Sequence, residues 1–225
     1  MNKEIYKQNI TALRNKYPAW ANIIKNRHKK QNIDVIVEKS VTGDTILKVK
    51  KDGKILYLNG KYAPEEVGKQ WLKKQGKIDA YATIVILGIS NGVHIKQIME
   101  SAPKTCNILI YEPSFELFRR EMEEVDLSFL FAMDIPVGIV IEGLNENELS
   151  AYINMMITYD NMTLMKFYLS GNYDVLFSEL VKKFVKELKD RIEEESIRWN
   201  TLVRYTDVKA KNTFYNLPYL YEGYS

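Results

Sequence analysis

The residues of this sequence that could do chemistry gather around one glycine turn. An apolar run at 83–87 ends in that turn, and a second apolar run at 108–111 ends in an acid. Together the turn, the helix start after it and the acid supply the candidate site residues: Gly88, Ser90, Asn91, Gly92, His94 and Glu112. In nucleotide-binding folds, such glycines permit a tight bend, let phosphate approach the backbone, and let helix and strand pack closely. Glu112, 24 residues after Gly88, stands where these folds hold ribose hydroxyls.

The spacing of this turn leaves two interpretations open. With Ser90 at the middle position, it fits the Gly-x-Gly-x-Gly turn of S-adenosylmethionine methyltransferases better than the dinucleotide fingerprint. However, Ile86 stands where those enzymes usually carry an acid, and Ser90 adds a side chain where close approach is needed. The turn therefore either binds a nucleotide or an S-adenosylmethionine-like ligand, or serves only as a joint of the fold, since glycine after a strand is common for turn geometry alone.

His94 also has two interpretations. It could reach into the crevice at the carboxyl ends of the strands, where open α/β sheets bind ligands, or it could be a helix-surface histidine bonded to nearby backbone. The remaining acids, Glu121, Glu123, Glu124 and Asp126, cluster at the end of a predicted helix and are expected to face solvent. The sequence contains no phosphate-binding loop and no His-x-x-x-His pair, so catalysis by this chain alone has little support.

The elements that position these residues follow from periodicity and turn signals. Strands are predicted at 33–38, 45–50, 55–58, 83–87, 108–111, 137–141 and 163–168. Helices are predicted at 6–17, from Pro64, and at 92–100, 114–123 and 147–156, with further amphipathic helix in the C-terminal third. The Asp52-Gly53 pair predicts a hairpin, so the first three strands are expected to form an antiparallel meander.

The later strands are continuous apolar runs that alternate with helices, as in a parallel sheet covered on both faces. The predicted fold class is therefore α/β and Rossmann-like: a mostly parallel sheet flanked by helices, with an N-terminal antiparallel β-meander and long C-terminal helices. The expected divisions are a helix and meander at 1–62, the Rossmann-like part at 63–171, helices at 172–216, and a linker at 217–225.

Composition narrows the partners and the compartment. The chain has 225 residues, with 32 basic and 29 acidic side chains for a net charge of +3. That balance gives no electrostatic reason to expect nucleic acid or a membrane surface as a partner. Cys106 is the single cysteine, so no intramolecular disulfide or thiolate metal cluster can form and no metal is expected. The N-terminus lacks an apolar leader, which favours the cytoplasm.

Three separated segments resemble one family. Leu58-Asn59-Gly60-Lys61-Tyr62-Ala63-Pro64 is similar to the strand-to-helix segment ahead of the Rossmann-like region in bacterial motility accessory factors. The turn from Gly88 to His94 and the run Ile110-Tyr111-Glu112-Pro113-Ser114 resemble that region's glycine turn and following strand end. Asn212 and Asn216-Leu217-Pro218 resemble the asparagine-rich run that leads into the family's next domain.

This resemblance implies a role in flagellin glycosylation. Members of the family are similar to glycosyltransferases that attach nonulosonic acids to flagellin serines and threonines, and catalysis is assigned to a central domain that follows this one. The sequence ends at Ser225, before such a segment, so the resemblance implies an N-terminal accessory domain that is not catalytic alone and carries no transferable catalytic residues. The implied partners are flagellin or the downstream catalytic domain, and the C-terminal helices raise the alternative of a homo-oligomer.

Overall fold

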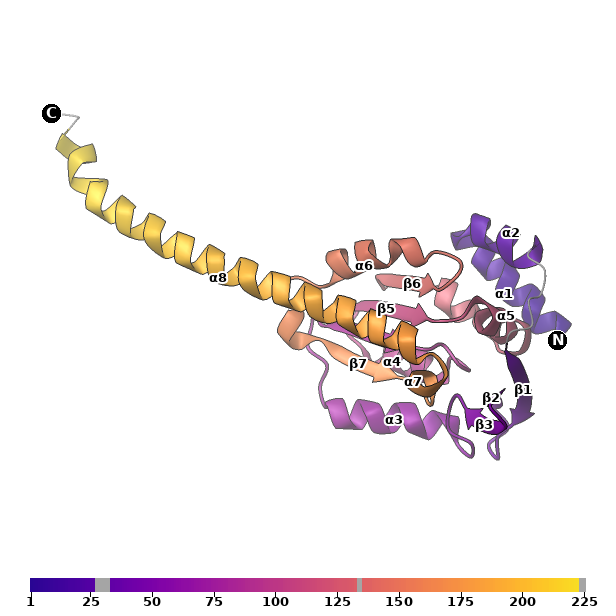
Figure 1. Ribbon diagram of the computed structural model, residues 1–225. Coiled ribbons are helices and arrows are strands. Elements are labelled where there is room, and N and C mark those ends of the chain that lie inside the picture. The colour runs from indigo at the N-terminus through magenta and orange to yellow at the C-terminus, as the bar shows by residue number, and fades with distance from the viewer. Residues whose placement is uncertain (27–32, 133–134, 223–225) are drawn as a thin grey trace.

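The computed structural model describes residues 1–26, 33–132 and 135–222. Two sheets organise the chain (Figure 1). The first is antiparallel, with β1 (Asp34–Lys39), β2 (Thr45–Lys51) and β3 (Lys54–Tyr57) in that order. The second is parallel, in the order β6-β5-β4-β7, with β4 at Thr83–Leu87, β5 at Asn107–Glu112, β6 at Val137–Ile141 and β7 at Lys166–Leu169. The predicted Rossmann-like α/β fold with its antiparallel meander is confirmed.

Strand order identifies where a ligand would bind in such a sheet. The chain passes from β4 to β5 to β6 on one side, and then returns to place β7 on the other side of β4. The connections are α4 (Val93–Ser101), α5 (Phe115–Glu124) with the 3-10 turn η1 (Ser128–Phe131), and α6 (Leu149–Met156) after the 3-10 turn η2 (Glu146–Glu148). The topological switch point therefore lies between β4 and β7, and the carboxyl ends of these strands border the expected ligand crevice.

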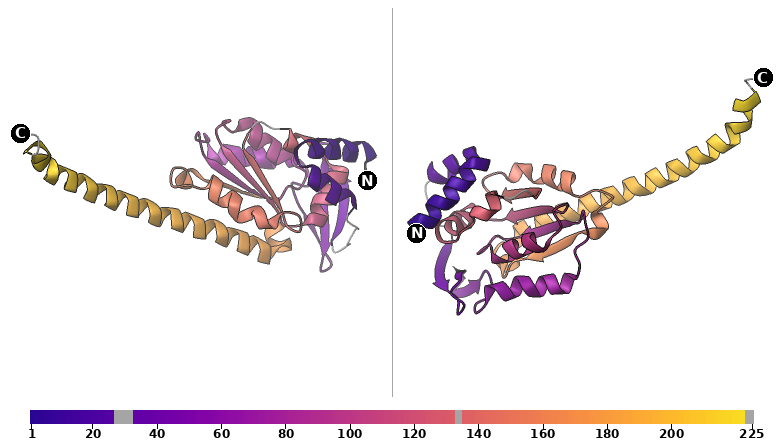
Figure 2. Two further views of the ribbon diagram at one scale, coloured as in Figure 1. Left: turned by 90° about the horizontal axis from the view of Figure 1, so that it is seen from above. Right: turned by 180° about the vertical axis from the view of Figure 1, so that it is seen from behind.

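Helices cover both faces of the parallel sheet. The helices α3 (Pro64–Gln75) and α4 lie on one face, and α6 and α8 (Ser178–Glu222) lie on the other (Figures 1 and 2). On the first face, Tyr168 of β7 stacks on His94 at 4.5 Å and meets Trp71 edge-on at 5.6 Å. On the second, Tyr111 of β5 stacks on Phe184 of α8 at 4.4 Å. Double coverage explains why the strand residues from Thr83 to Leu87 are all buried.

The N-terminal region forms two helices where the sequence predicted one. The first, α1 (Lys3–Lys16), begins at Asn2, whose side chain accepts hydrogen bonds from two backbone amides of the first turn. Pro18 ends the predicted helix but also starts α2 (Pro18–Asn26), because proline suits the first position of a helix. Asn9 of α1 is buried and donates to the carbonyls of Met122 and Val125 at 2.9 and 2.6 Å, which fixes α1 to the end of α5.

Two predictions near the C-terminus need correction. Residues 162–164 form the 3-10 turn η3 (Met162–Leu164), so the strand expected at 163–168 starts only at Lys166. After the short helix α7 (Tyr173–Leu176), α8 continues without interruption to Glu222, so residues 217–222 are helical where a linker was expected. The expected linker contains Pro218. Extending an existing helix adds a hydrogen bond per residue without a new nucleus, and an internal proline costs about 3 kcal/mol rather than forbidding the helix.

Only the first part of α8 packs on the body of the protein. Phe184, Leu188 and Glu195 are buried, whereas the described side chains from Ile197 onward are exposed. Figures 1 and 2 show the remainder of the helix projecting away from both sheets. Among the described residues, no helix is both long and apolar enough to cross a membrane.

Candidate functional site

The glycine turn lies at the switch point, directly after β4. Gly88 follows β4 directly, with φ of +92°, and its amide donates to the Tyr111 carbonyl at 2.8 Å. The turn ends at Gly92, also in the left-handed region with φ of +71°, where α4 begins. Each of the six candidate residues is buried. The structure thus brings them together, but under the surface rather than on an open crevice.

The side chain of Tyr173 occupies the space in front of Gly88. A Cβ atom built on Gly88 would lie 2.7 Å from Tyr173 Cζ and 2.8 Å from Ser170 Cβ. In a turn that binds a nucleotide, this is the face of the backbone that a phosphate approaches. Tyr173 follows β7 and is fully buried, and the Ser90 amide donates to its hydroxyl at 3.1 Å. The glycine is therefore required here for the close approach of a tyrosine of the same chain.

Glu112 bonds the turn instead of facing an open ribose site. Its Oε2 accepts hydrogen bonds from the Ile89 amide at 2.9 Å and the Tyr173 hydroxyl at 3.0 Å. Burial raises the pKa of Glu112 from 4.5 to about 8, and the bonds from Ile89 and Tyr173 limit that rise. Glu112, the last residue of β5, thus ties that strand to the turn after β4.

A second buried acid, Glu121 of α5, completes this cluster. Its Oε1 lies 3.1 Å from the Tyr173 hydroxyl, and burial together with the neighbouring Glu112 raises the pKa of Glu121 well above its usual value. The phenol has one hydrogen, so it can donate to one carboxyl only. At the other contact, the carboxyl must be protonated and donate to the phenol oxygen. The geometry therefore calls for at least one proton shared by Glu112 and Glu121 in the folded state.

The prediction that the acids at the end of α5 face solvent is wrong for most of them. Glu121 and Glu123 are 0% and 2% exposed, and of the four acids expected to face solvent only Asp126 is exposed. Glu123 is paired with Arg120 at 2.9 Å. The helix packs against α1 and contacts β1, so an acid at its end is enclosed.

His94 is buried and bonded to the turn, not on the helix surface. Its Nε2 lies 3.2 Å from the Gly88 carbonyl and 3.2 Å from Ser170 Oγ, and the ring stacks on Tyr168. Burial lowers the pKa of His94 from 6.5 to about 4, so the ring is neutral at neutral pH. The contact with the carbonyl requires the tautomer that carries hydrogen on Nε2. His94 thus holds the turn by a backbone bond.

The antiparallel sheet lies over the carboxyl ends of β4 and β7 and is bonded to the loops that follow them. Asn91 donates to the Thr45 carbonyl of β2 at 3.1 Å, and Asn172 donates to the Tyr57 carbonyl of β3 at 2.6 Å. The Lys51 ammonium, at the end of β2, donates to the carbonyls of Val175 and Leu176 in α7 at 3.2 and 3.0 Å. The meander therefore covers the carboxyl ends of β4 and β7, where a ligand would enter.

A nucleotide or S-adenosylmethionine does not fit the residues as they stand. Its phosphate or adenosyl group would have to displace Tyr173 from Gly88, and its ribose would have to displace two hydrogen bonds on Glu112. Ser90 Oγ is buried and finds no hydrogen-bond partner among the described residues, and Ser90 has a left-handed backbone with φ of +52°. The turn is strained, yet the position a ligand would take is filled by protein.

Sequence reasoning missed three members of this site: Ser170, Tyr173 and Glu121. Glu121 carried a usable signal, because it lies three and four residues after the apolar Phe118 and Leu117 on the same helix face. Ser170 and Tyr173 follow the last strand of the parallel sheet, whose place beside β4 is not encoded in any local pattern.

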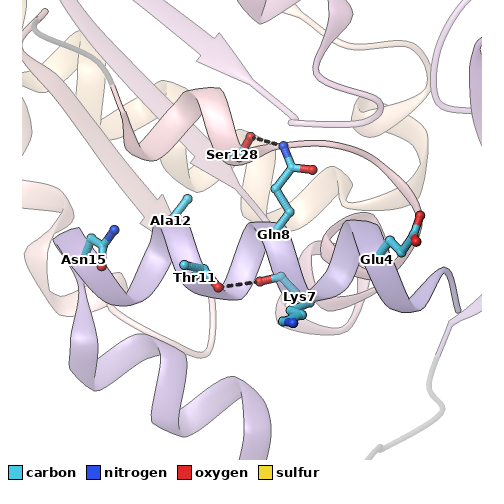
Figure 3. Close-up of a pocket in the computed structure, with 7 residues that line it drawn as sticks. All are labelled: Glu4, Lys7, Gln8, Thr11, Ala12, Asn15 and Ser128. Atoms are coloured by element: carbon cyan, nitrogen blue, oxygen red, sulfur yellow. Dashed lines mark hydrogen bonds between the residues drawn. The ribbon is translucent and has the colours of Figure 1, made fainter.

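A shallow groove of about 480 Å³ lies on the outer side of α1. Figure 3 shows its side chains along that helix, from Glu4 to Asn15, with Ser128 opposite. Gln8 bonds Ser128 at 3.0 Å, and the Thr11 hydroxyl bonds the Lys7 carbonyl at 2.8 Å. These polar groups bond one another within the wall, and the Ser128 hydroxyl also donates to Asp126 Oδ1 at 2.6 Å.

Comparison with known proteins does not assign this chain to a family. No protein-family model matches the chain, and no curated protein matches its sequence. Within 1–26, 33–132 and 135–222, there is no group of three or more His, Cys, Asp or Glu side chains that could hold a metal ion.

Proposed function

We propose that this chain is a non-catalytic accessory module of a motility-associated glycosyltransferase, which attaches nonulosonic acid to flagellin. The module would help recognise flagellin or assemble with the catalytic domain. The observation that carries the proposal is the filled switch point. Tyr173 Cζ lies 2.7 Å from the position of a Cβ built on Gly88, so the nucleotide-type turn packs against a side chain of the same chain. A Rossmann-like body with a sealed ligand edge suits binding and assembly better than chemistry.

The projecting part of α8 supports an assembly role. Leu188, Ile192 and Glu195 face the body, and Trp199 and Leu202 continue the same line at intervals of four and three residues. Trp199 stacks on Tyr159 at 5.2 Å at the edge of the body yet remains 44% exposed. Beyond it, Leu202 and Val203 are 49% and 48% exposed. These exposed apolar residues on the body side of α8 could pack against a further domain placed next to the Rossmann-like body.

The experiment is an in-frame deletion of codons 1–225 in the source organism. We expect intact-mass spectrometry of purified flagellin to show loss of glycan mass, and plasmid-borne wild-type protein to restore it. Complementation with Glu112→Gln should also restore the mass, because that position is structural in this proposal. Flagellin of unchanged mass in the deletion strain would refute the assignment.

The alternative function is an S-adenosylmethionine-dependent methyltransferase that uses Gly88, Gly92 and Glu112. The enclosed position of Tyr173 argues against it. Isothermal titration with S-adenosylmethionine separates the two: we expect no saturable heat with the wild type. Micromolar binding that is lost in Glu112→Ala would favour the enzyme.

A further inference from the structure

The projecting part of α8 carries a second line of side chains, on the side away from the body. Glu194, Ile197, Thr201, Arg204, Val208 and Lys211 follow one another at intervals of three, four, three, four and three residues. Such alternation is the seam of a coiled coil. We propose that this outer seam pairs antiparallel with the same seam of a second copy of this chain.

The apolar members of the outer seam are unusually open to solvent. Ile197 is 67% exposed, Val208 is 53% exposed, and Tyr205, beside the seam, is 59% exposed. Thr201, between them, is suited to burial because its hydroxyl already donates to the Ile197 carbonyl at 2.9 Å. The seam from Ile197 to Lys211 is about 21 Å long at 1.5 Å per residue, enough for several interhelical layers.

Charge determines the direction of pairing. The acid Glu194, with Glu193 beside it, stands at the N-terminal end of the seam, and Arg204 and Lys211 stand toward the C-terminal end. Glu194 is 66% exposed, and its contact with Arg191 is long, at 3.6 Å. A parallel pair would set Glu194 against Glu194 and Lys211 against Lys211, whereas an antiparallel pair sets each acid against a base.

One register satisfies both the apolar and the charged positions. With the two-fold axis between residues 202 and 203, Ile197 lies opposite the partner's Val208, and Glu194 lies opposite the partner's Lys211. Thr201 then lies opposite the partner's Arg204, so no two like charges of the seam face each other. Because the bodies contact the other side of each helix, through Leu188 and Glu195, they lie outside the pair and do not obstruct it.

Self-association is tested by sedimentation equilibrium across a concentration series. For so small a contact, we expect a dimer with a dissociation constant of about 10 to 100 µM. Glu194→Lys alone and Lys211→Glu alone should each weaken the dimer about tenfold, since each creates two like-charge layers. The double exchange, Glu194→Lys with Lys211→Glu, should restore it. Glu179→Lys makes the same charge change at a position 84% exposed in the first turn of α8 and should have no effect.

Disulfide trapping tests the direction. Chains with Ile197→Cys and chains with Val208→Cys, mixed and oxidised, should form mainly mixed dimers, because these two positions lie opposite each other in the proposed pair. The native Cys106 is buried and should not compete for the disulfide. The proposal is overturned by a monomer at about 500 µM, far above the expected dissociation constant. Homodimers of Ile197→Cys as the main product, or single charge reversals without effect, would overturn it equally.

Discussion

The buried acid pair makes the stability of this protein depend on pH in a direction opposite to that of most carboxylates. Burial raises the pKa of Glu112 from 4.5 to about 8. Between these two values, the folded chain keeps a proton that the unfolded chain releases, so the free energy of unfolding falls as pH rises. One proton corresponds to about 1.4 kcal/mol per pH unit, so the total fall for Glu112 is on the order of 5 kcal/mol. Glu121, whose pKa is also raised by burial, acts in the same direction.

Glu112→Gln removes this proton while keeping the shape of the side chain. We expect urea unfolding of the wild type to give a free energy that decreases between about pH 5 and about pH 8. In the variant, this decrease should be smaller by about 1.4 kcal/mol per pH unit, so its stability relative to wild type improves as pH rises. Glu100→Gln, at an exposed position of α4, is the matched control. Parallel curves for the wild type and Glu112→Gln would refute the account of a protonated buried pair.

Three further substitutions test the packing around the turn by urea unfolding. Gly88→Ala should cost at least about 3 kcal/mol, because the new Cβ would clash with Tyr173 at 2.7 Å. Gly43→Ala, at a similar φ of +89° with nothing within 4 Å, should cost only about 1 kcal/mol of backbone strain, and equal losses would exclude the clash. Tyr173→Phe should cost about 1–3 kcal/mol, because the buried Ser90 amide loses its acceptor; an unchanged midpoint would contradict this bond. Asn9→Ala should cost about 2–4 kcal/mol by leaving buried carbonyls unpaired, whereas the exposed Asn15→Ala should change stability by less than about 0.5 kcal/mol.

The sequence by itself determined the elements and their class. The apolar runs, the Asp52-Gly53 hairpin and the helix start at Pro64 are local signals, and local sterics and hydrophobic periodicity act within a few residues. They located β4 and β6 to the residue, and they placed Gly88 and Glu112 at the ends of adjacent parallel strands.

Only the tertiary structure decided what the turn does. Whether Gly88 faces a ligand or a side chain depends on what β7 brings back to the switch point, and Tyr173 lies 85 residues further along the chain. The raised pKa of Glu112 likewise comes from desolvation by the whole fold, and that of Glu121 from desolvation and the nearby Glu112. A glycine after a strand indicates that some group approaches the backbone closely. Whether that group is a ligand or a side chain such as Tyr173 depends on long-range packing.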